Sequence, residues 1–510
     1  MNASPMHASS APGCPGLAAL EARLAQDLAW LELPARPWVL PAPGQAAATH
    51  DVAIVGAGMA GITAAAALRL AGIRAVCFDR APEGYEGPWV TTARMETLRS
   101  PKHLTGPALG LPALTFRAWF EAIHGEAAWQ ALDKIPRPMW MDYLRWFRRV
   151  TGIEVRNGLE VSAVRPLPDE AGVELALTDG SRHWNQRFSR VVLASGRDGL
   201  GGPAVPEFAA ALDRSTWAHS SDAFDPAWLR GRRVIVIGGS ASAMDCAATA
   251  LEAGATGVDL LIRRAVMPLV NKTKGAGYPG MVHGYIDLPD ESRWRLRRYF
   301  NRVQVPPPRG STLRVSRHAN ARFFLGAPVL AAGHGVSGAW LETPVGRFEA
   351  DVVLFATGFR SDFARRPELA AIAPAIRLWA DRYSPPADDA DEELAGMPDL
   401  GPAFEFVERS PGACPGLSRV HCFCYPALMT HGALAGDIPA ISEGAQRLAR
   451  GMASLLLRDA FAAHFAAVQA YDDPELLGDE WRAAQRESSP TDGIPATNTG
   501  ADPSAPSSAT

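Results

Sequence analysis

Glycines at a fixed spacing, Gly56, Gly58 and Gly61, are the residues of this sequence that point most directly to chemistry. They follow an apolar run in the order Gly-x-Gly-x-x-Gly, in which the first glycine allows a tight turn and the second lets a pyrophosphate approach the backbone. The third glycine lets a helix pack closely on a strand, and Asp79, at the end of the next apolar run, can hold a ribose hydroxyl. Together the four residues predict a dinucleotide site.

A second turn of the same kind lies much later in the chain, in the stretch VIVIGGSASAMD. Gly238, Ser240 and Ala243 stand at its three fingerprint positions, and the next strand ends in two arginines instead of an acid. Guanidinium groups there favour the 2′-phosphate of NADP, with a solvated strand end as the alternative. The expected contacts of this second dinucleotide are Gly238, Ser240, Ser242, Arg263 and Arg264. Two turns predict two dinucleotides held at once, FAD at the first and a hydride donor at the second.

Each turn needs a strand before it and a helix after it, and the sequence supplies both. Residues 51–80 predict a strand, an Ala-rich helix and a second strand, and residues 231–264 repeat this order. The apolar runs 189–196 and 350–359 predict strands that return to the first sheet on either side of an inserted second domain. The predicted fold is therefore α/β, with two nested Rossmann-like dinucleotide-binding domains and flexible tails.

These elements divide the chain into six expected parts. They are an N-terminal extension with one helix (1–48), the first part of the FAD domain (49–205), an NAD(P)H domain (206–349), the return part of the FAD domain (350–457), a C-terminal helical segment (458–485) and a disordered tail (486–510).

The composition is that of an ordinary globular protein. Its 510 residues are 47% hydrophobic and 20% charged with a net charge of −4, so no basic excess favours nucleic acid as a partner. No apolar stretch reaches the roughly 20 residues of a membrane span and no secretory signal opens the chain, so a cytoplasmic location is expected. The six cysteines are scattered, and Cys422 and Cys424, expected on alternate faces of a strand, predict no metal site. The oligomeric state is left open, a homo-oligomer included.

The combination of motifs resembles the class B flavin-dependent monooxygenases, the superfamily of flavin-containing monooxygenases, Baeyer–Villiger enzymes and N-hydroxylases. The stretches that carry the resemblance are Gly56 to Gly61 with Asp79, residues 217–243 with His219 ahead of the second turn, and Ala356, Thr357, Gly358 and Phe359. The resemblance implies bound FAD, NADPH as electron donor with NADH as the alternative, O2 as co-substrate and a flavin hydroperoxide as oxidant. Asp213 and Ser215 stand where two of the subfamilies carry Phe and Gly, so Baeyer–Villiger chemistry is not expected.

Segment 86–122 is expected to cover the flavin and the substrate. Trp89 is placed at the cofactor, and Arg99 and Lys102 are expected to meet an anionic or carbonyl-rich substrate. The other candidates in this segment are Arg94, His103, Phe116, Trp119 and Phe120. A second polar loop, 270–285, adds Asn271, Lys272 and Lys274.

Segment 421–452 is expected, by resemblance, to lie against the isoalloxazine and ribityl chain. Its candidates are His431, Gly432, Gly436 and Asp437, with a helix cap as the alternative role of Asp437. The expected catalytic residues of the whole chain are His219, Arg99, Lys102 and His431, and Thr357, Gly358 and Asp437 are expected at the cofactors. His219 is expected to link the domains or orient the nicotinamide, with a helix-entry or surface histidine as the alternative. His103 or His431 is a candidate base.

The sequence therefore predicts a monooxygenase that hydroxylates a small polar substrate containing nitrogen. Over the whole chain it resembles a group of bacterial FAD-dependent urate hydroxylases, which implies a planar, anionic substrate that meets Arg and Lys. N-hydroxylation of an amine or amino acid stays open as an alternative. An NAD(P)H:acceptor reductase is the second alternative, although a thiol-disulfide reductase would need a redox pair of cysteines near the flavin, which the sequence does not supply. A flavin-binding protein without turnover is disfavoured, because two dinucleotide sites imply electron flow.

Overall fold

The first dinucleotide turn lies in a strand–helix–strand unit made of β1 (Val52–Val55), α2 (Met59–Leu70) and β2 (Ala75–Asp79). The two strands run parallel, with Val52 paired to Ala75 and Val55 to Phe78. Helix α2 is Ala-rich and buried along all but its last two residues, so small side chains let it lie close to the sheet. The predicted order of elements is confirmed here.

The computed structural model describes residues 15–40, 50–168, 172–197, 199–335 and 338–484. The predicted disordered tail at 486–510 lies outside these ranges, as does Cys14. Within the chain, residues up to Phe461 form one unit and Ala462–Thr510 a second.

Strands β1 and β2 belong to a five-stranded parallel sheet with the order β18-β7-β1-β2-β3. The added strands are β3 (Glu154–Asn157), β7 (Arg190–Leu193) and β18 (Val420–Cys422). The prediction that 350–359 returns to this sheet is wrong, because Val352–Phe355 pairs with the second sheet and Val420–Cys422 is the returning strand. Both segments are continuous apolar runs, which any buried parallel strand produces, so the pattern does not say which sheet takes them.

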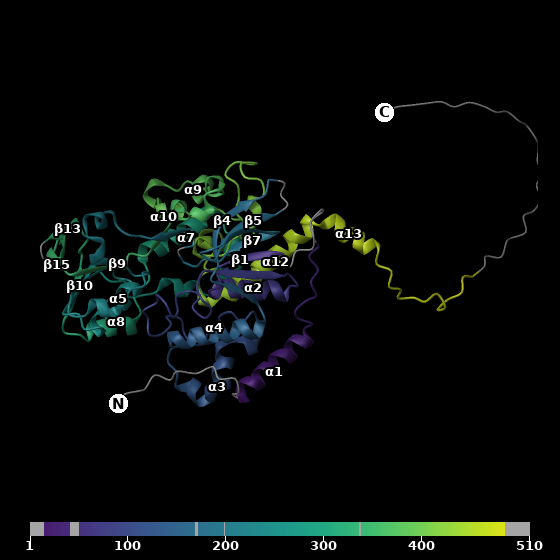
Figure 1. The fold of residues 1–510 in the computed structure, drawn as a ribbon, viewed down its shortest axis with the longest axis horizontal. Coiled ribbons are helices and arrows are strands. Elements are labelled where there is room, and N and C mark those ends of the chain that lie inside the picture. The colour runs from purple at the N-terminus through teal and green to yellow at the C-terminus, as the bar shows by residue number, and fades with distance from the viewer. Residues whose placement is uncertain (1–14, 41–49, 169–171, 198, 336–337, 485–510) are drawn as a thin grey trace, which may run out of the picture. The chain divides into compact units, whose positions relative to one another are not determined.

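The second sheet is also parallel and has the order β12-β11-β10-β16-β9. Its strands are β9 (Trp217–His219), β10 (Arg233–Ile237), β11 (Gly257–Ile262), β12 (Ala321–Leu325) and β16 (Val352–Phe355). Helices α5 (Ala241–Glu252) and α8 (Arg309–Ser316) lie together on one face (Figure 1). Successive residues of β10 pack on opposite faces of this sheet. Val234 and Val236 contact α5, and Ile235 contacts the small antiparallel sheet within residues 331–350.

Three smaller sheets complete the strands. A two-stranded antiparallel ribbon of β8 (Gly201–Pro203) and β17 (Phe359–Ser361) stands where the chain enters and leaves the second domain. The others are β4 (Glu160–Pro166), β5 (Val173–Thr178) and β6 (His183–Phe188), and β13 (Ala331–Gly335), β14 (Gly338–Thr343) and β15 (Gly346–Ala350).

The other α-helices described in the first unit cover the sheets or connect them. They are α1 (Pro15–Trp30), α3 (Phe116–Ala131), α4 (Arg137–Thr151), α6 (Pro279–Gly284), α7 (Asp290–Val303), α9 (Trp379–Arg382), α10 (Glu392–Ala395), α11 (Leu428–His431) and α12 (Ile441–Asp459). Helix α13 (Phe461–Gln469) begins at the last residue of the first unit and otherwise belongs to the second. Helix α1 confirms the helix expected in the N-terminal extension. The helical prediction for 458–485 is wrong over the described residues 470–484, because Pro474 and Gly478 interrupt the helical pattern.

Two further findings concern the classes considered from composition. Over the ranges the structure describes, no helix combines the length and apolarity that crossing a bilayer takes. The prediction that Cys422 and Cys424 lie on alternate faces of a strand is wrong, because the strand ends at Cys422 and the two buried sulfurs lie 3.6 Å apart.

Candidate cofactor and substrate site

The first turn can be built only with glycine at two of its positions. Gly56 has a φ of 101°, and a Cβ there would lie 2.6 Å from the carbonyl oxygen of Ala194, which follows β7. A Cβ on Gly61 would overlap the carbonyl oxygen of Gly56. The glycine loop therefore lies in close contact with the N-terminal residues of α2, as a pyrophosphate site requires.

Gly58 and Asp79 complete this turn. Gly58 is the N-cap of α2 without any side-chain cap, so the N–H groups of the first helical turn are open to an anion. Opposite it lies Gly87, whose Cα would be 3.7 Å from a Cβ on Gly58. The Asp79 carboxylate accepts the N–H groups of Ala57 (2.7 Å) and Ala81 (2.8 Å), which fixes the turn and leaves a second lone pair on each oxygen for a ribose. These residues fit an FAD.

Gly87 lies between Gly58 of this turn and the ring of Trp89. The Trp89 and Trp140 rings meet edge to face, with their centroids 6.3 Å apart. The other aromatics of segment 86–122 do not cover a cofactor. They are Phe116, Trp119 and Phe120, all buried in the main core. The prediction for these three is wrong, because the apolar face of α3 packs inward against α4.

The second turn repeats the first. Gly238 has a φ of 131°, and its Cβ would lie 2.6 Å from the carbonyl oxygen of Ala356. Ser240 is the N-cap of α5 and its hydroxyl makes no cap hydrogen bond, and Ser242 lies half-buried in the first helical turn. Beyond β11, Arg263 is exposed, whereas Arg264 donates to the carbonyl of Arg302 (3.1 Å). Of the two arginines, Arg263 is the better placed for a 2′-phosphate.

We expect Arg263→Ala to lower kcat/KM for NADPH about tenfold and to leave that for NADH nearly unchanged, because one charge-assisted hydrogen bond to a phosphate contributes about 1.5 kcal/mol. Initial rates with each dinucleotide measure this. Arg347→Ala, an exposed arginine on β15 of the same domain, is the control. An equal loss with both dinucleotides would contradict a 2′-phosphate role.

His219 ends the edge strand β9 and is 1% exposed. Its Nδ1 pairs with the hydroxyl of Ser221 at 2.8 Å, its ring meets Phe359 edge-on at 5.5 Å, and its N–H donates to Asp222 (2.9 Å). The ring thus orders the loop that follows β9, and the surface alternative is wrong. Orientation of the nicotinamide stays a prediction.

Arg94 connects segment 86–122 to that same loop. Its guanidinium donates to the carbonyls of Ser220 (2.5 Å) and Asp222 (2.6 Å) and lies 3.9 Å over the ring of Phe224. Burial lowers the pKa of Arg94, and Asp222 partly opposes this. Arg94 is therefore a tether between the segment that flanks the first turn and the second dinucleotide domain.

Arg99 and Asp245 form a second link between the same parts. The Arg99 guanidinium lies 3.7 Å from the Asp245 carboxylate on α5. Burial raises the pKa of Asp245, while Ser311 and the neighbouring arginines oppose the rise. Burial lowers the pKa of Arg99, which Asp245 and, more weakly, Asp437 counteract. Arg99 thus links segment 86–122 to α5 of the second domain.

Lys102 does not face a substrate. Its ammonium donates to the carbonyls of Trp129 (2.6 Å), Leu132 (2.5 Å) and Gln130 (3.4 Å). The three carbonyls lie at the C-terminal end of α3 and use all three N–H groups of the Lys102 ammonium. The structure therefore gives Lys102 the role of capping α3 and not a catalytic one. His103 lies against the edge of Trp129 at 5.9 Å.

Three other predicted residues have local structural partners. The Thr357 hydroxyl donates to Ala204 (2.6 Å), and the carbonyl of Gly358 accepts the N–H of Ala204 (2.9 Å), so both fasten the entry and exit of the second domain. Asn271 caps a short 3-10 helix by accepting the N–H of Thr273 (3.0 Å). Lys272 and Lys274 are exposed on that helix.

His431 is fully buried. Its Nε2 donates to the carbonyl of Gly401 (3.0 Å), and its ring stacks on Phe404 at 3.7 Å. Burial lowers its pKa to about 3, so the imidazole is neutral at physiological pH. These contacts give His431 a structural role in the core, and its role as a catalytic base stays a prediction. Gly432, which follows it, has a φ of 80° and turns the chain toward the exposed Gly436 and Asp437.

Asp437 makes no cap hydrogen bond to the helical turn that follows, so its alternative role is not seen. Its carboxylate instead acts on the pKa of Arg99 and of Tyr425. A Cβ on the neighbouring Gly436 would lie 3.8 Å from the Cα of Tyr425, so the loop of Asp437 packs against Tyr425.

Acid should destabilise this protein through His421 and His431. Burial lowers both pKa values from 6.5 to about 3. Between pH 6.5 and about pH 3 the unfolded chain binds protons that the folded chain does not. The free energy of unfolding is therefore greatest above pH 6.5 and falls as the pH drops from 6.5 toward 3. At about pH 5.5 each histidine should cost about 1 kcal/mol. Thermal unfolding at about pH 7.5 and about pH 5.5 measures the loss, and His431→Gln should lose less than the wild type. Equal losses would contradict the assignment.

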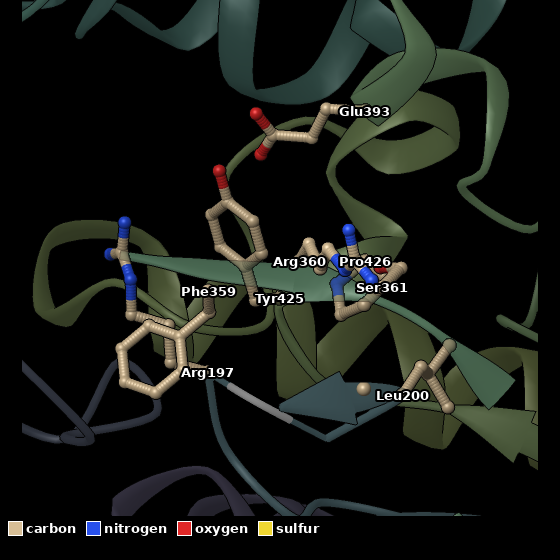
Figure 2. Close-up of a pocket in the computed structure, with 9 residues that line it drawn as sticks. Arg197, Leu200, Phe359, Arg360, Ser361, Glu393, Tyr425 and Pro426 are labelled. Carbon is tan, nitrogen blue, oxygen red and sulfur yellow. The ribbon is translucent and has the colours of Figure 1, made fainter. Parts of the chain in front are cut away.

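One pocket opens at the carboxyl ends of the neighbouring parallel strands β7 and β18 (Figure 2). The pocket is shallow, and the roughly 210 Å³ of space within its outline includes open solvent. Its lining residues are Arg197, Leu200, Gly201, Phe359, Arg360, Ser361, Glu393, Tyr425 and Pro426. None was predicted as a pocket residue. Their position in the sequence could have identified two of them. Arg197 and Tyr425 follow the carboxyl ends of parallel strands, where ligands of open α/β sheets bind.

Comparisons with known proteins agree with two dinucleotide domains. Residues 50–274 match the model of the pyridine nucleotide-disulphide oxidoreductase family. A protein of Xanthomonas campestris pv. campestris named FAD-dependent urate hydroxylase is 39% identical over 467 residues, 91% of this chain and 98% of that protein. A putative glutamate synthase [NADPH] small chain of Cereibacter sphaeroides is 29% identical over 240 residues, 47% of this chain and 46% of that one.

Solved structures share the fold. The ornithine hydroxylase of Pseudomonas aeruginosa superposes with a TM-score of 0.62 at 16% identity, over 80% of this chain and 99% of that one. The lysine 6-monooxygenase of Pseudomonas syringae gives a TM-score of 0.60 at 18% identity, over 80% and 99%. At this identity the likeness establishes the two-domain architecture alone.

Proposed function

Since it is 39% identical along nearly the whole length of an FAD-dependent urate hydroxylase, the chain belongs to the family of these enzymes, and on that premise we propose that it hydroxylates urate. The protein is an FAD-dependent monooxygenase, an oxidoreductase that takes electrons from a reduced nicotinamide dinucleotide and uses O2 on a small molecule. The observation that carries the proposal is the pair of glycine turns, each closed against a parallel strand, within one chain.

The residues of the first turn would hold FAD. Gly56 and Gly58 admit the pyrophosphate at the start of α2, and Asp79 is placed for the ribose. When bound, the flavin supplies the redox chemistry, accepting a hydride and activating O2. The chain's own task is to bind, orient and shield the reactants.

The second turn and the tethers would position the hydride donor. We propose NADPH, because Arg263 is exposed at the end of β11 beside the N-terminus of α5. Arg94 and Arg99 would hold this domain against segment 86–122, so that the nicotinamide meets the flavin in one geometry.

Urate is supported over an amine by the family and by the charges around the pocket. Arg197 and Arg297 both act to lower the pKa of Tyr425 at the pocket, and this local positive charge suits an anionic substrate. A disulfide reductase is not supported, because thiol exchange needs access and the Cys422 and Cys424 sulfurs are buried. We further propose a cytoplasmic location, where reduced dinucleotides are supplied, and no nucleic-acid partner, given the net charge of −4.

Urate should accelerate the oxidation of NADPH by the purified holoenzyme and be consumed mole for mole with it. Rates with urate, ornithine, lysine and no substrate test this, with H2O2 measured to detect uncoupled turnover. Acceleration by an amino acid alone would make the protein an N-hydroxylase. Acceleration by an artificial electron acceptor alone would make it a reductase.

A further inference from the structure

The pocket at the ends of β7 and β18 has a recognisable chemical pattern. Arg197 follows β7 and Tyr425 follows β18, and the Arg197 guanidinium lies 4.7 Å over the Tyr425 ring. From the ribbon at the domain entry, Phe359 presents its ring beside Arg197, and Glu393 of α10 points its carboxylate toward the Tyr425 hydroxyl (Figure 2). Donors, an acceptor and aromatic faces thus converge from four elements.

The charges in this pocket are only partly satisfied by the protein. Within the part of the chain that the structure describes, Arg197 forms no ion pair. Arg197 and Glu393 are both exposed at the rim of the pocket. Partial desolvation and Asp391 raise the pKa of Glu393, while Arg197 and a hydrogen bond with Tyr425 act in the opposite direction. Burial raises the pKa of Tyr425, against the effect of Arg197. Because Arg197 and Glu393 do not pair directly, the guanidinium and the remaining lone pairs of the carboxylate can bind a ligand.

We propose that Arg197, Tyr425 and Glu393 recognise the substrate, a planar oxopurine anion. This rests on the proposed function. The Arg197 guanidinium donates to the carbonyl or anionic edge of the ring, and Glu393 accepts a ring N–H while the Tyr425 hydroxyl holds the Glu393 carboxylate in place. Phe359 offers its face to the ring. An amino-acid substrate would bind the same two charged side chains, Arg197 and Glu393, without using the aromatic face, and it becomes an outcome of the test.

Arg197→Met should raise the KM for urate and the Kd of urate for the oxidised holoenzyme at least about tenfold, and Arg197→Lys should recover part of the loss, because a single charge lacks the planar fork. Glu393→Gln should raise both about fivefold, because it keeps the shape and loses the charge. FAD content and the thermal midpoint establish that each variant is folded. The Kd is measured by titrating urate into the yellow protein and following the flavin spectrum.

Two matched controls accompany these variants. Glu392→Gln changes the neighbouring exposed residue of α10, which does not line the pocket, and Arg347→Met changes an exposed arginine of β15. Both should bind and hydroxylate urate like the wild type. A wild type that hydroxylates urate while Arg197→Met binds it equally well would overturn this inference alone. A wild type that neither binds nor oxidises urate would overturn both proposals, and tight binding of ornithine or lysine lost in Arg197→Met would replace the oxopurine by an amino acid.

Discussion

Gly61→Ala is expected to yield a colourless protein that lacks FAD and hydroxylates nothing. The added Cβ would overlap the carbonyl oxygen of Gly56, which is backbone and has no way to move without opening the turn. Overpacking of this kind costs about 1–3 kcal/mol where neighbours can adjust, and more against backbone, so FAD affinity should fall at least about a hundredfold. The FAD released on heating, measured per mole of purified protein, gives the result.

Gly310→Ala is the matched control for this change. Gly310 lies in α8, and a Cβ there meets nothing within 4 Å. Alanine in an exposed helical position favours the helix, so this variant should keep its FAD and its stability. A Gly61→Ala protein with a full complement of FAD would contradict the assignment of the first turn.

Arg94→Ala is expected to separate NADPH consumption from hydroxylation. The change removes two short hydrogen bonds to the loop after β9 and the contact with Phe224. Because a reactant displaced by about 1 Å can cost about a hundredfold in rate, hydride transfer should slow at least about tenfold. A larger share of the O2 consumed should appear as H2O2, since the second domain no longer shields the flavin.

Anaerobic stopped-flow reduction by NADPH and a peroxide assay during turnover measure these two effects. Arg117→Ala, in which an arginine at the start of α3 loses its exposed pair with Glu121, is the control. Hydride transfer and coupling unchanged in Arg94→Ala would show that the tether has no part in the reaction.

The parts of the fold that the sequence predicted are those with local causes. Gly56 and Gly238 stand at positive φ values beside a neighbouring strand, and each demands glycine whatever the distant chain does. The strand at Val352–Phe355 was assigned to the wrong sheet because its partner, β10, is decided by long-range packing. An apolar run carries no information on its partner.

The site was harder to predict because polar residues serve structure as often as chemistry. Lys102 carries the positive charge expected of a residue that binds an anionic substrate, yet its ammonium binds three carbonyls at the end of α3. His431 is in the expected segment, yet it packs on Phe404 in the core. Glu393 lies on α10, almost two hundred residues from Arg197, and only the folded chain brings them to one pocket.

If this protein hydroxylates urate, one atom of O2 enters urate at the expense of one NADPH. Mass spectrometry of the first product formed by the holoenzyme with urate, NADPH and ¹⁸O2 measures this directly. We expect one ¹⁸O atom per product molecule and one NADPH oxidised for each product. Urate that is recovered unlabelled, with the O2 consumed appearing as H2O2, would contradict it.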